Sequence, residues 1–217
     1  MGRAGSWFAA DHVPCTPDII ATAKGLGAGY AAISATLCHE RVYDAVASGS
    51  RRFTLGHTWH GAPLPCAVGS AVIDALRREA LIDRVAERGP RLRDELADAL
   101  ADVNMVREVR GHGYLLGVEY VDPRDRSSFL PPGLRVAGRI DDLALERGLV
   151  ILSIQPTGDD YVGDQSLFAP PFTTGDSELE EMVARFAGVV RDVAGEVERD
   201  LAGREPVPEA VSAGDRQ

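Results

Sequence analysis

The chain has 217 residues, 45% of them hydrophobic, with a formal net charge of −10 at pH 7. This length allows one or two packed units, and the acidic balance argues against a nucleic-acid partner, which requires a basic surface. The sequence has no apolar stretch of the ~18 residues that a membrane span needs, and its three cysteines lack metal-ligand spacing, so we expect a cytoplasmic protein with reduced thiols and no membrane partner.

The first predicted strand is the apolar run at residues 18–23, which follows a loop and leads directly into Lys24. Lys24 is the only lysine of the chain, since every other member of its 23 Lys and Arg residues is arginine. A lysine amine can lose its proton and act as a nucleophile, whereas a guanidinium group stays protonated. Lys24 is therefore the candidate catalytic residue, with chance in an arginine-rich composition as the alternative.

Three glycines follow this lysine at alternate positions, Gly25, Gly27 and Gly29. Glycine permits a tight turn and lets the backbone approach a ligand closely. The spacing differs from the G-x-G-x-x-G fingerprint, and no helix start follows, so a dinucleotide site is rejected. The stretch predicts a turn that presents the Lys24 amine.

A second strand is expected at residues 31–37, and a short helix at 40–47. The segment Gly-His-Thr-Trp-His-Gly at 56–61 then places Thr58 beside glycines, where a hydroxyl and backbone N–H groups can donate to phosphate oxygens. A threonine in an ordinary turn is the alternative. His57 and His60 have no third ligand at a recognisable spacing, so no metal site is predicted.

Helical patterns follow, beginning at Pro63, which suits a first turn, and running to Val85. Gly89–Pro90 should kink or split this pattern, which continues as the stripe Leu92, Leu96 and Leu100. The elements expected after it are two strands within 103–121, a loop at 122–133, a helix at 135–147, a strand at 149–154, a turn-rich connection at 155–163 and a last strand within 165–174.

The final predicted helix begins with a capping box formed by Ser177 and Glu180. Its apolar stripe is strong and indicates core packing. From about residue 202 the sequence is rich in Gly, Pro, Glu and Ala, which predicts a disordered tail.

Several separated segments resemble one family. Met1–Ala9 (MGRAGSWFA), Pro17–Ile20 (PDII) and the Lys24 turn are similar to class III (omega-type) aminotransferases, and the resemblance runs to about residue 195. It implies an α/β fold, that of a fold-type I PLP-transferase. Residues 1–62 would be the C-terminal part of the PLP-binding large domain, 63–201 a helix-rich connection with a small α+β C-terminal domain, and 202–217 the tail.

The resemblance also implies chemistry. The lysine that matches Lys24 forms a Schiff base with pyridoxal 5'-phosphate (PLP), and the threonine that matches Thr58 reaches the cofactor phosphate of the neighbouring subunit, which implies a homodimer. The expected enzyme is a PLP-dependent transaminase that moves an amino group from an amine or amino acid to a 2-oxo acid. A racemase, mutase or decarboxylase on the same fold stays open, because the lysine turn alone does not select the reaction.

Other family residues have no counterpart in this chain. The aspartate that pairs with the pyridinium nitrogen, the phosphate loop and the stacking aromatic residue precede the match to Met1, so the chain resembles a C-terminal half that needs a missing N-terminal half. The alternative is a non-catalytic fragment or assembly module of a split or truncated enzyme, inactive alone. Relatives that act on α-amino acids often carry a carboxylate-binding arginine where Leu167 stands, and some amine-specific relatives carry a mobile arginine near Asp160. This sequence has neither, which favours an amine, an ω-amino acid or a larger amino compound as donor.

Overall fold

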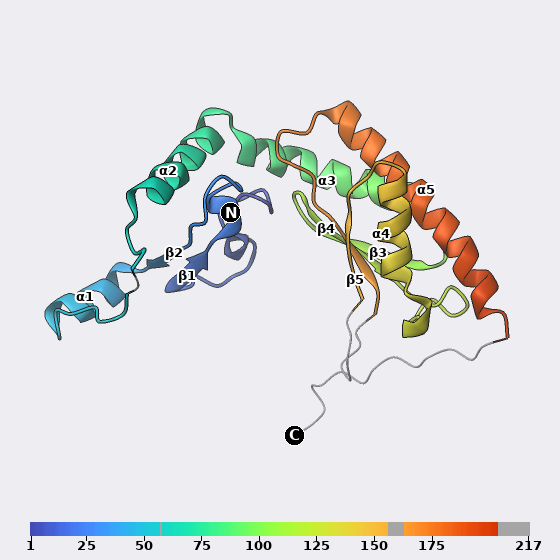
Figure 1. The fold of residues 1–217 in the computed structure, drawn as a ribbon, viewed down its shortest axis with the longest axis horizontal. Helices are drawn as coiled ribbons and strands as arrows, with labels where there is room; N and C mark the ends of the chain where they lie inside the picture. The colour runs from blue at the N-terminus through green and yellow to red at the C-terminus, as the bar shows by residue number, and fades with distance from the viewer. Residues whose placement is uncertain (57, 156–162, 204–217) are drawn as a thin grey trace, which may run out of the picture. The chain divides into compact units, whose positions relative to one another are not determined.

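The computed structural model describes residues 1–56, 58–155 and 163–203 and divides into two compact units, Met1–Val85 and Ala86–Gln217 (Figure 1). We call them unit 1 and unit 2. The predicted domain boundary between residues 62 and 63 stays a prediction, because compactness within this chain does not report which domain of a larger fold a residue belongs to. Among the described residues, no helix is both long and apolar enough to cross a membrane.

Unit 1 contains a small antiparallel sheet of two strands, in which Ile19 lies opposite Cys38 and Thr22 opposite Ala35. The first strand agrees with the predicted run at 18–23, and the second is shorter than predicted because residues 31–34 return from the glycine-rich turn. The elements of unit 1 are η1 (Ala9–His12), β1 (Ile19–Thr22), η2 (Lys24–Leu26), β2 (Ala35–Cys38), α1 (Glu40–Ser48), α2 (Pro63–Arg78) and the first residues of α3 (Leu81–Ala99).

The helical pattern after Pro63 forms two helices, where the sequence predicted one up to Val85. They are separated at Ala80, whose φ of +48° is incompatible with a continuous α-helix. Of the kink or split predicted at Gly89–Pro90, the split was wrong, since Pro90 lies inside α3, and the kink stays a prediction. Proline disfavours a helical predecessor through a clash with that residue's Cβ, and Gly89 has none.

Unit 2 contains a four-stranded antiparallel sheet in the order β3-β4-β6-β5 (Figure 1). Strands β3 and β4 form a tight hairpin, in which His112 pairs with Leu115. The predicted strands and helices of this region are confirmed, although β5 is shorter than the apolar run at 149–154. The elements are β3 (Val106–His112), β4 (Leu115–Tyr120), η3 (Pro132–Leu134), α4 (Val136–Glu146), β5 (Leu152–Ile154), β6 (Gln165–Phe168) and α5 (Asp176–Leu201).

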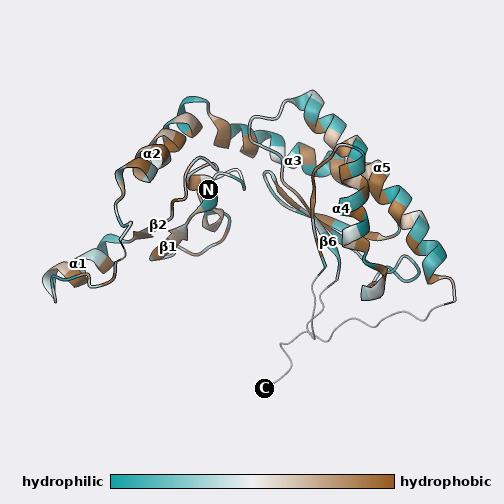
Figure 2. Ribbon diagram, viewed as in Figure 1, coloured by the Kyte–Doolittle hydropathy of each residue, from teal (hydrophilic) through white to brown (hydrophobic). Residues whose placement is uncertain are grey.

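The core of unit 2 lies on one face of this sheet. Leu116, Val118 and Phe168 are fully buried there, and the Phe168 ring packs against Phe186 of α5 with centroids 5.6 Å apart. The apolar stripe of α5 faces inward as predicted, and Figure 2 shows its alternation with hydrophilic residues. Leu145, an apolar residue of α4, is 65% exposed.

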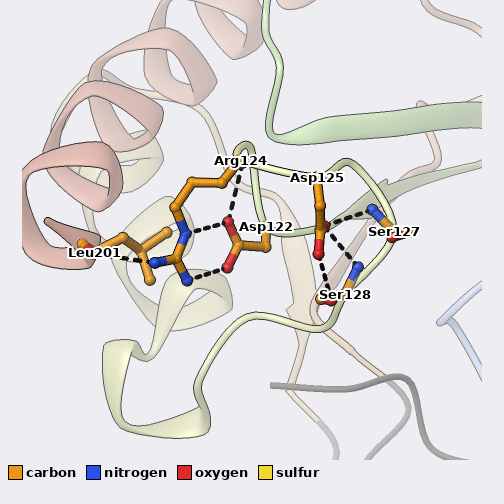
Figure 3. A network of polar contacts seen from close by, with 6 residues as sticks. All are labelled: Asp122, Arg124, Asp125, Ser127, Ser128 and Leu201. Atoms are coloured by element: carbon orange, nitrogen blue, oxygen red, sulfur yellow. Dashed lines mark hydrogen bonds and ion pairs between the residues drawn. The ribbon is translucent and has the colours of Figure 1, made fainter. Parts of the chain in front are cut away.

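A polar network closes the end of this core (Figure 3). The fully buried Asp122 carboxylate accepts hydrogen bonds from the backbone N–H of Arg124 at 3.0 Å and from its Nε at 2.9 Å, and Arg124 Nη1 donates to the Leu201 carbonyl at 3.3 Å. The guanidinium lowers the pKa of Asp122. Hydrogen bonds from Ser128 and Ser127 lower the pKa of the neighbouring Asp125 to about 2. The network ties the loop after β4 to the last turn of α5.

The start of α5 differs from the prediction. The Glu178 carboxylate accepts the Gly175 N–H at 2.7 Å, so the capping interaction begins two residues before the predicted pair Ser177 and Glu180. Gly175 has extended backbone angles and is the true cap. The predicted turn-rich connection lies largely, and the predicted tail almost wholly, outside the described residues.

Candidate functional site

Lys24 lies two residues after the end of β1, at the first position of η2. Its φ of +49° places it in the left-handed region, which is uncommon for a residue with a side chain and often marks a functional site. The side chain is exposed. Within residues 1–56, 58–155 and 163–203, no carboxylate forms an ion pair with it. The amine is thus accessible to a ligand.

The turn around Lys24 is closed by its own backbone. The Leu26 N–H donates to the Ala23 carbonyl at 3.1 Å, the Gly27 N–H to the Lys24 carbonyl at 3.0 Å, and the Tyr30 N–H to the Gly27 carbonyl at 2.8 Å. This agrees with the prediction of a glycine-rich turn. The turn holds Lys24 in place through main-chain geometry, which leaves its side chain available for chemistry.

Helix α2 supports the turn from one side. Leu26 is only 7% exposed, and it lies near Gly69, a buried glycine of α2. A Cβ atom at Gly69 would be 3.1 Å from Ile33 Cδ1 and 3.8 Å from the Leu26 carbonyl oxygen. The sequence did not identify these residues, because the space beside a glycine depends on which distant residue packs there.

The start of β1 is fixed by Asp18. The Asp18 carboxylate accepts a hydrogen bond from Arg41 Nε at 2.8 Å and pairs with Arg41 Nη2, while the Asp18 carbonyl accepts the His39 N–H at 2.8 Å. The Arg41 hydrogen bond lowers the pKa of Asp18. These contacts join the strand that carries Lys24 to the first turn of α1.

Thr58, the second predicted cofactor residue, lies in an exposed turn after the irregular segment 51–56. No hydrogen bond or ion pair of the described residues joins Thr58 to the Lys24 turn. A role for both residues in one site, with Thr58 acting on a neighbouring copy, stays a prediction.

A serine and a histidine also meet near the N-terminus. His12 Nε2 lies 3.2 Å from Ser6 Oγ and 2.9 Å from the Ala4 carbonyl oxygen. A carbonyl oxygen can only accept, so Nε2 carries the proton and cannot act as a base toward Ser6. Ser6 Oγ itself donates to the Phe8 carbonyl at 2.7 Å. The pair stabilises the loop before β1 and is not a catalytic dyad.

The described residues contain no group of three or more His, Cys, Asp and Glu side chains arranged to hold a metal ion. His57, which the sequence raised as a metal-ligand candidate, lies outside the described residues.

The family model described as aminotransferase class-III matches residues 1–190. The chain belongs to the class III aminotransferases. The predicted family and α/β fold of the fold-type I PLP-transferases are thereby confirmed. The Lys24 turn and Thr58 both lie within the matched residues.

Individual class III relatives agree with this assignment. An uncharacterised aminotransferase, YodT of Bacillus subtilis, is 32% identical over 92% of this chain and 45% of its own length. A diaminobutyrate–2-oxoglutarate transaminase of Halomonas elongata is 36% identical over 93% of this chain and 42% of its own. A PLP-bound amine transaminase from an uncultivated Pseudomonas species superimposes with a TM-score of 0.74, at 28% identity, over 90% of this chain and 42% of its own.

The chain thus spans less than half the length of the curated class III relatives it matches. Residues that complete the site of such a relative therefore need not have a counterpart among these 217.

Proposed function

We propose that this chain carries the cofactor-binding lysine of a PLP-dependent transaminase, and that Lys24 is that residue. The supporting observation is that the Lys24 amine is unique in the sequence and accessible. It is the only side-chain amine of the sequence, it is exposed, and it stands in a strained backbone position within the residues that match the family. An amine can bond to the aldehyde of PLP, so this residue fits the cofactor.

The remaining roles follow from the chemistry of each side chain. When bound, PLP withdraws electrons from the substrate carbon. The Lys24 amine would hold the cofactor and, once released from it, move a proton at that carbon as base and then acid. The Thr58 hydroxyl would donate to the phosphate of a cofactor held by a second copy of the chain.

The proposed substrates are an amine or ω-amino acid as donor and a 2-oxo acid as acceptor. One relative acts on diaminobutyrate and 2-oxoglutarate by its name, and another is an amine transaminase. Leu167, in β6, is half-buried and carries no charge for an α-carboxylate. Leu167 and the amine transaminase favour a donor whose α-carboxylate, if it has one, is not held at this position.

We propose further that activity needs residues equivalent to the part of the relatives that this chain does not match. The two-stranded sheet supports this, because apolar side chains occupy both of its faces. Ile20 and Leu37 share one face, while Ile19, 57% exposed, lies opposite Cys38 on the other. Figure 2 shows the hydrophobic character of β1 and β2. Strands with two apolar faces are typical of a sheet covered on both sides.

The same exposed sheet favours the alternative function, a non-catalytic module that serves assembly. Trapping of the cofactor separates the two. The 217-residue chain is mixed with PLP, with and without a polypeptide equivalent to the unmatched part of a relative, then reduced with borohydride and peptide-mapped. A transaminase subunit yields the reduced cofactor on Lys24, and adding the polypeptide increases the yield. An assembly module yields no Lys24 adduct under either condition.

The matched variants are Lys24→Arg and the double variant Lys24→Arg/Arg51→Lys, which moves the only lysine to another exposed position. We expect no side-chain adduct in either. An adduct at position 51 equal to that at Lys24 in the unchanged chain would show that any exposed amine reacts, and would refute the proposed role.

A further inference from the structure

Ile33 lies between two glycines that flank the Lys24 turn. A Cβ atom at Gly27 would be 3.0 Å from Ile33 Cγ2, and one at Gly69 would be 3.1 Å from Ile33 Cδ1. At Gly27 such a Cβ atom would first meet the Ala31 carbonyl oxygen at 2.1 Å, with the Ile33 methyl group next, whereas at Gly69 the Ile33 Cδ1 methyl group is the nearest atom. Contacts this short are tighter than side chains normally make, so Gly69 leaves room for Ile33. The isoleucine therefore joins the turn on one side to helix α2 on the other.

The contacts of Ile33 and of α2 restrict the Lys24 turn at two neighbouring residues, Gly27 and Leu26. The Gly27 N–H donates to the Lys24 carbonyl. A residue that packs against Gly27 therefore restricts the residue that is hydrogen-bonded to Lys24. The buried Leu26 also lies against Gly69, and its carbonyl oxygen is 3.8 Å from the position of a Cβ there. Ile33 and Leu26 thus both pack against α2, in addition to the turn's own backbone hydrogen bonds.

This support matters because Lys24 has a strained backbone. A side-chain-bearing residue at a φ of +49° persists only where its surroundings impose that conformation. The hydrogen bonds of the turn are all local, whereas the contact with α2 links residues far apart in the sequence. The packing of Ile33 against both glycines is the contact that can fix the turn relative to the rest of unit 1.

We propose that Ile33 and Gly69 are positioning residues for Lys24: they lock the turn on α2 and so set the place and direction of the amine. The effect of these two residues on catalysis rests on the proposed function. Their effect on the conformation of Lys24 does not, and it can be measured without cofactor.

The test uses the fact that Lys24 is the only lysine. Protein produced with isotopically labelled lysine gives NMR signals from this residue alone, and its backbone shifts report the left-handed conformation. The variants are Ile33→Ala, Gly69→Ala and Gly69→Ala/Ile33→Val. Valine lacks the Cδ1 atom that the new Cβ at position 69 would meet. The control is Leu64→Ala, which removes a 75% exposed side chain from the same helix.

We expect the Lys24 signal of Ile33→Ala and of Gly69→Ala to move by more than its line width. The double variant should restore the original position, and the control should leave it unchanged. The rate at which formaldehyde and cyanoborohydride methylate the Lys24 amine should follow the same pattern, with a change of at least about twofold. Circular dichroism of each variant checks that it is folded.

Three results would overturn the proposal. The signal of the unchanged chain could coincide with its position in urea, which would mean that the chain does not position Lys24. Both single variants could be folded and leave the signal in place. The double variant could fail to restore the Lys24 signal that Gly69→Ala had shifted, which would mean that the shift came from a general loss of packing in unit 1. If the signals respond as expected and borohydride still traps no cofactor on Lys24, the positioning stands and the proposed function fails.

Discussion

The two units differ sharply in how they bury apolar surface. In the described part of unit 1, the buried apolar side chains are few: Ala4, Leu26, Leu76, Ile82 and Val85. Large apolar side chains lie exposed there, Tyr30 at 86% and Trp59 at 78%. Unit 2 instead has a sheet face covered by α5, with fully buried aromatic residues. Unit 2 can therefore be stable by itself. Unit 1, which carries Lys24, exposes large apolar side chains that nothing in the described part of the unit covers.

The largest expected effect is in the core of unit 2. Replacing the fully buried Phe186 with alanine should lower the free energy of unfolding by about 3–5 kcal/mol, because the cavity left beside Phe168 cannot fully close. Urea unfolding followed by circular dichroism measures it. The control is Leu145→Ala, 65% exposed on α4, with an expected change within about 0.5 kcal/mol. Equal effects of the two changes would contradict a packed core in unit 2.

A second prediction concerns the order of unfolding. Both tryptophans of the chain, Trp7 and Trp59, lie in unit 1. The Arg77 guanidinium stacks 5.4 Å from the centroid of the Trp7 ring, so Trp7 emission reports whether the N-terminal loop stays on α2. In a Trp59→Phe background, we expect Trp7 emission to change at a lower urea concentration than far-UV circular dichroism. Coincident transitions would show that the two units unfold together and would remove the contrast between them.

The third prediction uses the buried carboxylate of unit 2. Arg124 lowers the pKa of Asp122 in the folded chain, so the stabilisation is complete above the unfolded value of about 4 and is lost as the pH falls through the folded pKa. Asp122→Asn should lower Tm by several degrees at pH 7. The difference from the unchanged chain should shrink below pH 4. The exposed Asp98→Asn is the control, and a difference independent of pH would argue against this ion pair.

The smallest expected effect is a gain. Gly195 lies inside α5, and a Cβ there would meet only the Arg199 side chain at an ordinary 3.8 Å. Gly195→Ala should therefore raise the free energy of unfolding by about 0.5–1 kcal/mol through helix propensity. Thermal unfolding measures it. A loss of stability would mean that α5 is packed more tightly on that side than its contacts indicate.

The predictions from sequence were most accurate for elements whose apolar spacing alone decides which face is buried. The apolar stripe of α5 and the leucines of α3 face the core because their spacing matches a helix, and the run before Lys24 forms a strand because it is apolar and short. The predictions failed where tertiary contacts decide. Pro90 is accommodated inside α3 by a glycine that lacks the clashing atom, and the helix predicted up to Val85 is interrupted at Ala80.

The same distinction applies to the site. Lys24 could be put forward as a candidate from the sequence, because one amine among arginines is a chemical signal that needs no structure. Gly69 and Ile33 could not be proposed from the sequence, because their contact joins a glycine of α2 to a side chain 36 positions earlier in the printed sequence.

The contact between Gly89 and Gly113 limits how sequences of this family can change. A Cβ at Gly89 would be 2.4 Å from Gly113 Cα, so the backbone of α3 touches the backbone of the β3–β4 hairpin. No side chain, not even alanine, fits at position 89 unless the main chain moves. Because the obstacle is backbone, a second substitution at position 113 cannot compensate for the first. Neither a single substitution at position 89 nor a paired substitution at 89 and 113 is therefore tolerated. Homologues that keep this hairpin on α3 should keep this glycine.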